Sequence, residues 1–424
     1  MADIRSASPQ PAKPSGSGGK NVPDKRPLRV AGRIPPQVNA YYKKVSNAYK
    51  GCAIALLLLL FAFFLAMTAF FGDFMTYENV RYLVRDFGAM MASDGGGTGF
   101  ASVVYNGSDS MKFDTFKNGL AAASGDKYLY FDATGIRMVE EDSGCSEPVL
   151  VPAEKYLLLY DLGGTGYSIY NPLTRIIRRT AENPILCGSM SDSGAFLLVT
   201  RSRETRYVVE VYNSAFQHTM RIYKENYVLD AALSPDGTNI MIASAVPDNT
   251  DFRCEVAFCR VGQSDASTIS YSHTMPLDVC ATDNGFILLC DTALYFYDFD
   301  GTLQTSVSLA GMALSYADMN DHSVAVVGNV NALGMESRVL ILAPSGEILL
   351  DTVLQEMRVT GVEASVNPAE VLVYLETPEG ILQIGADGEQ KLYDAGNASV
   401  IGLVPVKNGA IICTKTSAYA VFAE

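Results

Sequence analysis

The sequence predicts an all-β fold, an eight-bladed β-propeller, which follows a single transmembrane helix and a disordered N-terminal tail. Three observations support this prediction. The stretch from Cys52 to Phe71 is apolar and contains no charged residue. Short apolar runs separated by tight turns recur from residue 102 to the end of the chain. Residues 1–40 are rich in Pro, Ser, Gly and Lys and have no periodic apolar pattern, so they cannot form a packed core.

The apolar stretch has the length that a membrane span requires. At about 1.5 Å rise per residue, a twenty-residue helix covers roughly 30 Å, the thickness of a hydrocarbon core. A cleaved signal peptide is the alternative, but the fifty-residue hydrophilic leader and the long apolar core both exceed the size of one. We therefore expect an uncleaved anchor over residues 51–72.

Charge predicts the orientation of this anchor. Ten Lys and Arg but only two acidic residues precede Gly51, which gives the tail a net charge of +8. The remainder of the chain has 22 basic and 44 acidic residues. Positively charged flanks stay in the cytoplasm. The predicted location is therefore the cell membrane, single-pass, with the tail in the cytoplasm and the long C-terminal part outside it.

Several segments flank the span. We expect residues 1–40 to form a disordered basic cytoplasmic tail and residues 41–50 a basic, aromatic juxtamembrane segment. Apolar residues at helical spacing predict an amphipathic helix over residues 73–92. A Gly-rich linker over residues 93–101 leads to the propeller at residues 102–424.

A two-strand unit repeats along the propeller segment. VLDAALSPDG followed by TNIMIAS, from Val228, matches PLDVCATDNG followed by FILLCD, from Pro276. Eight such copies recur at intervals of about 30 to 50 residues, the period of a four-stranded propeller blade. Because the first copy has a poor fourth strand around Cys145, a seven-bladed ring is the alternative.

The two ends of the repeat region predict how the ring closes. The last copy ends at Glu424 after three strands. We expect Asp109 to Phe116, just ahead of the first copy, to supply the fourth strand and so remove an exposed sheet edge.

Composition excludes several functions. The acidic exterior lacks the basic footprint that nucleic-acid binding requires. The eight cysteines form no CxxC pair, so we expect buried free thiols and no zinc site. No GxSxG, HExxH or Walker motif is present. We therefore predict no catalytic residues, no cofactor and no metal, and as partner a protein, a peptide or a cell-wall component.

Three carboxylates form the first candidate site. Counting seven residues back from the first turn of a repeat leads to Asp230, Asp278 and Glu363. Each lies on an innermost strand, and innermost strands line the central channel of a propeller. We expect the three carboxylates to gather near the channel mouth and to bind a cation, a cationic ligand group or water. The alternative is that they merely solvate the channel.

Long loops between the second and third strands form the second candidate site. These loops project from one rim, and such loops commonly carry recognition. Arginine presents a planar fork that suits carboxylate or phosphate. The alternative is a solvated run of charges. The predicted rim-binding residues are Arg201, Arg203, Arg206, Asp248, Asp251 and Arg253.

Two features resemble known families. The turn Leu233-Ser-Pro-Asp-Gly237 resembles that of WD40-like and TolB-like propellers, although the Trp-Asp signature is absent and the chain has no Trp. The order of basic tail, span, Asn79-Val-Arg-Tyr-Leu-Val-Arg-Asp86, linker and propeller is similar to an uncharacterised family of Gram-positive single-span, membrane-anchored propeller proteins. This resemblance implies a place in the cell envelope and no known activity.

The functional prediction is a membrane-anchored extracytoplasmic propeller that acts as a scaffold or sensor by binding, without catalysis. The alternative is a cell-envelope enzyme, a glycan lyase or glycosidase, that uses the channel carboxylates. A signal transducer acting through the tail is a third possibility, but the tail contains no domain.

Overall fold

A computed structural model describes the helix over residues 40–70 and most of the chain from residue 100 to residue 422. Within the second part it describes residues 100–108, 110–248, 251–263, 266–331, 336–367, 371–394, 399–407 and 409–422. The predicted tail up to residue 39, the amphipathic helix and the Gly-rich linker up to residue 99 lie outside the described residues. The chain divides into two compact units, one up to Met75 and one from Thr76 onward.

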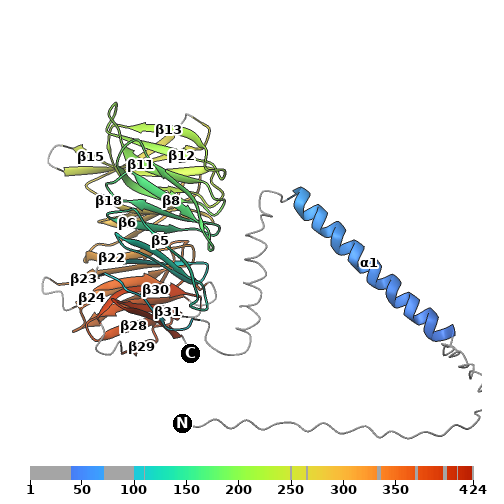
Figure 1. Cartoon of the computed structure of the whole chain (residues 1–424). Coiled ribbons are helices and arrows are strands. Elements are labelled where there is room, and N and C mark those ends of the chain that lie inside the picture. Colours follow the sequence, from blue (N-terminus) through green and yellow to red (C-terminus); the bar gives the residue numbers. More distant parts are fainter. Residues whose placement is uncertain are drawn as a thin grey trace, which may run out of the picture. The chain divides into compact units, whose positions relative to one another are not determined.

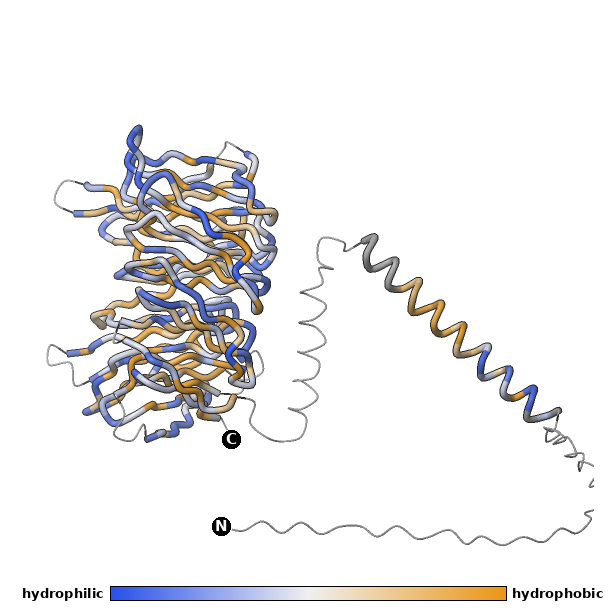
Figure 2. The backbone as a smooth tube through the Cα atoms, viewed as in Figure 1, coloured by the Kyte–Doolittle hydropathy of each residue, from blue (hydrophilic) through white to orange (hydrophobic). Residues whose placement is uncertain are grey.

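The first unit contains one helix, α1 (Ala40–Phe70). Its segment Lys43–Phe63 is long and apolar enough to cross a membrane, and none of it is buried by the rest of the protein. Leu59, for example, exposes 71% of its surface. Figure 2 shows how the polar start of the helix gives way to an apolar stretch. This confirms the apolar helix that the sequence predicts.

The second unit is an eight-bladed propeller, as predicted, and each blade is a four-stranded antiparallel sheet (Figure 1). The first four sheets comprise β2 (Lys112–Phe116), β3 (Gly119–Ala123), β4 (Lys127–Phe131) and β5 (Arg137–Asp142); β6 (Pro148–Pro152), β7 (Leu157–Asp161), β8 (Gly166–Tyr170) and β9 (Arg175–Thr180); β10 (Ile185–Met190), β11 (Phe196–Arg201), β12 (Tyr207–Tyr212) and β13 (His218–Lys224); and β14 (Tyr227–Leu233), β15 (Asn239–Asp248), β16 (Asp251–Arg260) and β17 (Ala266–Ser272).

The next four sheets complete the ring. They comprise β18 (Pro276–Thr282), β19 (Gly285–Cys290), β20 (Ala293–Tyr297) and β21 (Leu303–Ser308); β22 (Ala313–Met319), β23 (Val324–Asn329), β24 (Glu336–Leu342) and β25 (Ile348–Gln355); β26 (Gly361–Ala364), β27 (Leu372–Thr377), β28 (Gly380–Gly385) and β29 (Gln390–Tyr393); and β30 (Val400–Val406), β31 (Gly409–Thr414), β32 (Ser417–Phe422) and β1 (Val103–Val104).

The seven-bladed alternative is wrong because the first blade has a complete set of strands. Its fourth strand is β5, and Cys145 lies beyond the end of that strand. The predicted first copy of the repeat, which follows Phe116, starts one strand too late in this blade. Gly119 begins the second strand, and the first strand is β2, whose alternating KFDTF pattern lacks the apolar run of the other copies.

The segment that closes the ring also differs from the prediction. The fourth strand of the last blade is β1, in which Val103 pairs with Ala418 and Val104 pairs with Ser417. The predicted closing segment, Asp109 to Phe116, instead contains β2 of the first blade. The two ends of the repeat region therefore do close the ring, and β2 packs beside β30 of the last blade.

The core of the propeller lies between neighbouring blades. The second strand of each blade contacts both neighbours, so it is apolar on both faces. Every residue of β3, β19 and β31 is buried. In one representative cluster, Leu197 and Val199 of the third blade pack against Val228 and Ile240 of the fourth. Burial of apolar area at about 25 cal/mol per Å² is the main stabilising term in such a layer.

Candidate functional site

The first strands of all eight blades surround a central cavity of about 540 Å³. Its wall is strongly acidic. The described residues that line it include no Lys, Arg or His. The carboxylates that line it are Asp114, Asp192, Asp230, Asp278, Asp318, Asp321 and Glu363.

The structure brings the three predicted channel residues to this cavity, but at two levels along the strands. Asp230 and Asp278 each follow a β-bulge near the start of their strand. Glu363 is the next-to-last residue of β26, and Asp318 is the next-to-last residue of β22. Asp230 and Asp278 therefore form one pair on adjacent blades, and Asp318 and Glu363 form another.

Asp230 and Asp278 converge on one backbone group. The N–H of Val279 donates to Oδ2 of Asp230 at 2.9 Å and to Oδ1 of Asp278 at 2.9 Å. Burial, followed by the charge of Asp278, raises the pKa of Asp230 to about 8. At neutral pH this pair therefore retains a proton.

The second pair repeats this arrangement on the next two blades. The N–H of Ala364, the residue after Glu363, donates to Oδ2 of Asp318 at 2.7 Å. Burial raises the pKa of Asp318 to about 6. Burial, followed by the charges of Asp318 and Asp114, raises the pKa of Glu363 well above its usual value. In both pairs, a carboxylate on one blade holds the first strand of the next blade.

Asp114 adds a fifth carboxylate to the inner strands. Its Oδ1 accepts a hydrogen bond from the N–H of Thr115 at 2.7 Å. Burial raises its pKa to about 7. The last blade separates Asp114 from Glu363 in the closed ring, and the charge of Asp114 still contributes to the raised pKa of Glu363.

The cavity extends to the turns between first and second strands. Asp192 and Asp321 lie on these turns, and burial together with Asp283 and Asp192 raises the pKa of Asp321 to about 6. Because successive strands run in opposite directions, these turns lie on the face opposite to the loops between second and third strands. The acidic cavity therefore runs from the level of Asp230 and Asp278, near the strand starts, to these turns, which lie on the face opposite to the predicted rim.

The predicted rim residues lie on the third and fourth blades. Arg201 ends β11, and Arg203 and Arg206 lie in the following loop. The guanidinium of Arg206 lies 3.9 Å from the ring centroid of Tyr227 in a cation–π contact, which links the two blades.

The other rim residues belong to the projecting hairpin of β15 and β16. Asp248 ends β15 and pairs with Asp251 at the start of β16. Nδ1 of His273 lies 2.6 Å from Oδ2 of Asp251, and this hydrogen bond lowers the pKa of Asp251. Arg253 pairs with Ser272 of β17.

Comparison with known proteins decides the family. A model described as "Family of unknown function (DUF5711)" matches residues 101–419. The chain belongs to the DUF5711 family. No curated protein matches it in sequence.

Solved structures similar to this DUF5711 protein are propellers. The C-terminal WD40 domain of Sif2 has 10% identity and a TM-score of 0.54, over 76% of this chain and 97% of that domain. The WD40 domain of Neurospora crassa Pan2 has 8% identity and a TM-score of 0.47, over 76% of this chain and 94% of that one. The likeness to Sif2 shows the fold alone and agrees with the predicted WD40-like resemblance. Membership of a Gram-positive membrane-anchored family stays a prediction.

Sequence reasoning missed two of the inner carboxylates of this DUF5711 protein. Asp114 was missed because the first copy of the repeat was placed one strand late. Asp318 was missed because it is only one residue from the end of its strand, whereas Asp230 is three residues from the end of its own, so a count of seven residues back from the turn passes it. The alternation of side chains along a strand would have found them, because every second residue of a first strand faces the channel.

The arrangement favours binding of a cationic group over other chemistry. Among the described residues, no group of three or more His, Cys, Asp or Glu side chains is placed to hold a metal ion. All eight cysteines are free thiols. The paired carboxylates are engaged with backbone N–H groups, and an oppositely charged ligand would replace the proton that each pair retains.

Proposed function

We propose that this DUF5711 protein is a binding module of the cell envelope that is anchored by α1 and receives a cationic group of a partner in its acidic channel. The partner is a protein, a peptide or a cell-wall component. The observation that supports the proposal is the pairing of carboxylates on four adjacent blades. Asp230 with Asp278, and Asp318 with Glu363, face one cavity of about 540 Å³.

An organic cation fits this cavity better than a metal ion. A lysine ammonium or arginine guanidinium reaches into a channel on a long stem and needs only one or two carboxylates. The five carboxylates of the inner strands occupy two levels and five blades, an arrangement that favours an extended ligand over one compact ion. The alternative of a glycan lyase or glycosidase has no observation of its own in its favour.

The raised pKa values explain how such a ligand would be selected. Burial and a like-charged neighbour raise the pKa of a carboxyl group and so keep it protonated and neutral. A cation placed between the members of a pair stabilises the ionised form and lowers the pKa of both carboxyl groups. Binding therefore releases protons, and we expect affinity to rise with pH between about 6 and about 8.

The charge of the chain supports an extracytoplasmic propeller. The segment before Gly51 has ten basic and two acidic residues. The helix that follows is long and apolar enough to span a membrane. With the basic side retained in the cytoplasm, the propeller lies outside it.

A peptide-binding assay tests the proposal. We expect a fluorescent hexalysine peptide to bind the full chain in nanodiscs of neutral lipid at pH 8, and a hexaglutamate peptide not to bind. The double variant Asp230→Asn, Asp278→Asn should bind hexalysine about tenfold more weakly, because it removes one carboxylate pair. Fluorescence anisotropy measures both affinities.

A matched control separates the channel from general charge attraction. The double variant Asp126→Asn, Asp300→Asn removes the same charge from exposed turns outside the cavity. It should bind hexalysine as the unmodified protein does at 0.15 M salt. Equal losses in the two double variants, or no loss in the channel variant, would reject the channel as the binding site.

A further inference from the structure

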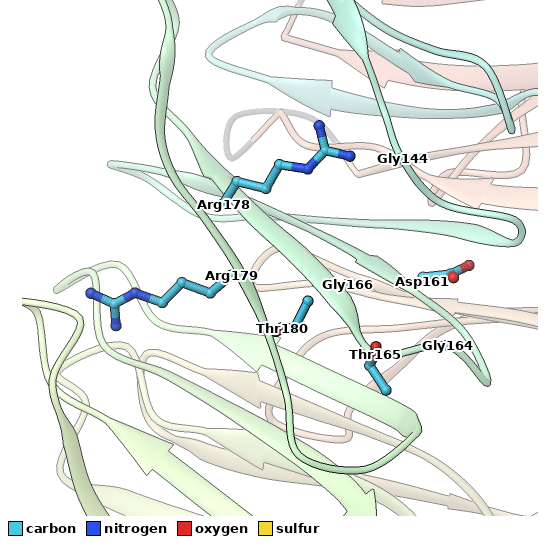
Figure 3. A pocket seen from close by; sticks show the side chains of 8 residues that line it. All are labelled: Gly144, Asp161, Gly164, Thr165, Gly166, Arg178, Arg179 and Thr180. Atoms are coloured by element: carbon cyan, nitrogen blue, oxygen red, sulfur yellow. The ribbon is translucent and has the colours of Figure 1, made fainter.

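A second cavity lies between the first and second blades, in the region shown in Figure 3. Its volume is about 530 Å³. It is built from the connection after β5, the loop between β7 and β8, and the outer strand β9. The loop between β7 and β8 joins a second to a third strand, so this cavity lies on the face opposite to the turns that border the acidic channel.

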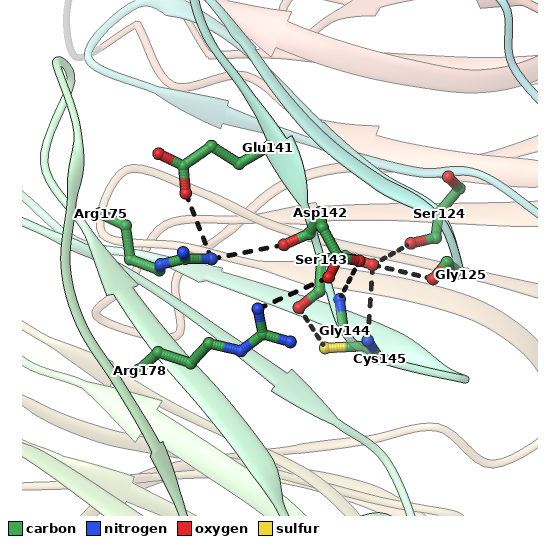
Figure 4. Close-up of polar contacts among 9 residues, drawn as sticks. All are labelled: Ser124, Gly125, Glu141, Asp142, Ser143, Gly144, Cys145, Arg175 and Arg178. Carbon is green, nitrogen blue, oxygen red and sulfur yellow. Dashed lines mark hydrogen bonds and ion pairs between the residues drawn. The ribbon is translucent and has the colours of Figure 1, made fainter.

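Arg178 of β9 forms one wall of this cavity. Its Nη1 lies 3.5 Å from Oδ2 of Asp142, which is a long ion pair (Figure 4). Its Nη2 lies over the backbone of Gly144, where a Cβ atom would be 1.8 Å from that nitrogen. Gly144 also has a φ of +65°, which favours glycine. The backbone at Gly144 therefore leaves room for the guanidinium, and the side chain of Arg178 is 46% exposed.

Asp161 at the end of β7 also lines this cavity. Its Oδ1 accepts hydrogen bonds from the N–H groups of Ser146 at 2.7 Å and Glu147 at 2.8 Å. Its Oδ2 lies over Gly164, where a Cβ atom would be 1.9 Å away. Within the described part of the chain, Oδ2 has neither a hydrogen bond nor an ion pair. One oxygen thus fixes the carboxylate and the other remains available.

Two threonines also line the cavity. Thr165 belongs to the Gly163-Gly164-Thr165-Gly166 loop, and Thr180 pairs through its backbone with Gly166. Figure 3 shows Arg178 extending toward Gly144, whereas Arg179 extends away from the other labelled side chains. The latter donates through Nη1 to the carbonyl oxygen of Phe216 at 2.7 Å, in the third blade.

We propose that this cavity binds a small zwitterionic ligand of the α-amino-acid type. The guanidinium of Arg178 receives the carboxylate, for which its planar fork is suited. Oδ2 of Asp161 receives the ammonium group, and Thr165 and Thr180 line the same cavity. An anion alone is repelled by Asp161 and a cation alone by Arg178, so the cavity selects a ligand that carries both charges.

Equilibrium dialysis with radiolabelled L-alanine tests this site in the full chain in neutral-lipid nanodiscs. We expect saturable binding of alanine, with acetate and ethylammonium about tenfold or more weaker as competitors than unlabelled alanine. Arg178→Gln should weaken alanine binding about tenfold or more. Arg178→Lys, which keeps the charge but loses the fork, should weaken it less.

Asp161→Asn distinguishes the two halves of the site. The asparagine carbonyl oxygen can still accept from Ser146 and Glu147, so the fold is retained, but the charge opposite the ammonium group is lost. Alanine should then compete no better than acetate. The control Arg137→Gln removes a charge from an exposed strand of the first blade and should leave alanine binding unchanged.

Three results would overturn the proposal. One is the absence of saturable alanine binding. Another is equal competition by alanine and acetate in the unmodified protein. The third is a correctly folded Arg178→Gln or Arg178→Lys variant, checked by circular dichroism, with unchanged affinity for alanine. None of these results bears on binding in the acidic channel, because that assay uses a different probe and different variants.

Discussion

Single carboxyl groups of the inner strands combine a structural role with the functional role that we propose. Asp230 and Asp318 each accept the N–H of the neighbouring blade, through Val279 and Ala364. These hydrogen bonds join the first strands of adjacent blades and hold them in register. Burial of the same groups raises their pKa values. The carboxyl groups that hold the blades together are thus also the ones that would lose a proton when a cation binds.

These pKa shifts predict how stability depends on pH. The pKa of Asp230 rises from 3.8 to about 8 and that of Asp114 to about 7 in the folded protein. Between these values the folded state binds more protons than the unfolded state, so the free energy of unfolding falls as pH rises. We expect the melting temperature to decrease from pH 5 to pH 8.5, and Asp230→Asn to reduce this decrease.

Thermal unfolding followed by circular dichroism at several pH values measures the effect. Asp126→Asn, which replaces an exposed aspartate, serves as the control and should leave the pH dependence unchanged. A melting temperature that is constant or increases over this range would show that the channel carboxyl groups do not carry raised pKa values.

The sequence predicts the residues of the site less completely than the strands that hold them. Counting back from glycine turns found Asp230 and Asp278, which occupy equivalent positions after a bulge. The same count reached Glu363 at a different level, because the turns of the blades differ in length. The cavity at Arg178 and Asp161 could not be predicted, because it depends on a contact between two blades.

At the scale of elements, the closure of the ring depends on a very short strand. β1 contributes only Val103 and Val104 to the last blade. Tyr105 adds to this short strand, since its N–H donates to the carbonyl oxygen of Thr416 at 2.9 Å. Its buried hydroxyl group donates to the carbonyl oxygen of Thr414 at 2.8 Å. These bonds link the two ends of the propeller segment.

Tyr105→Phe tests the contribution of this closing contact. The substitution removes the hydroxyl group and leaves a buried carbonyl oxygen with one partner fewer, which costs about 1 kcal/mol in the free energy of unfolding. Tyr316→Phe removes a hydroxyl group from a partly exposed position on β22 and should cost less than about 0.5 kcal/mol. Urea denaturation compares the two variants. Equal effects would mean that the hydroxyl of Tyr105 does not stabilise the closure.

Element patterns also explain where sequence prediction succeeded. The second and third strands of most blades are continuous apolar runs, because neighbouring blades cover both faces, and these runs made eight copies visible. The first strands carry polar residues toward the channel. Because β2 is polar, its sequence does not resemble the other strands, and the predicted first copy starts after it. As a result, the segment that contains β2 was predicted to close the ring, whereas β1 does so.

At the scale of the whole molecule, anchor and propeller together define the function that we propose. The apolar helix, the basic segment before it and the acidic propeller after it form one charge pattern along the chain. The central claim is that this pattern places a binding propeller outside the cytoplasm. The proposed partner of the acidic channel, a component of the cell envelope, would require that position.

Cysteine labelling in intact cells tests this claim most directly. Asp300→Cys places a thiol on an exposed turn of the fifth blade, whereas Ser17→Cys places one in the N-terminal tail. The seven native cysteines of the propeller are buried or half-buried, which keeps the background low. We expect a membrane-impermeant maleimide to label Asp300→Cys in intact cells and Ser17→Cys only after permeabilisation. The reverse pattern would place the propeller in the cytoplasm and contradict the account.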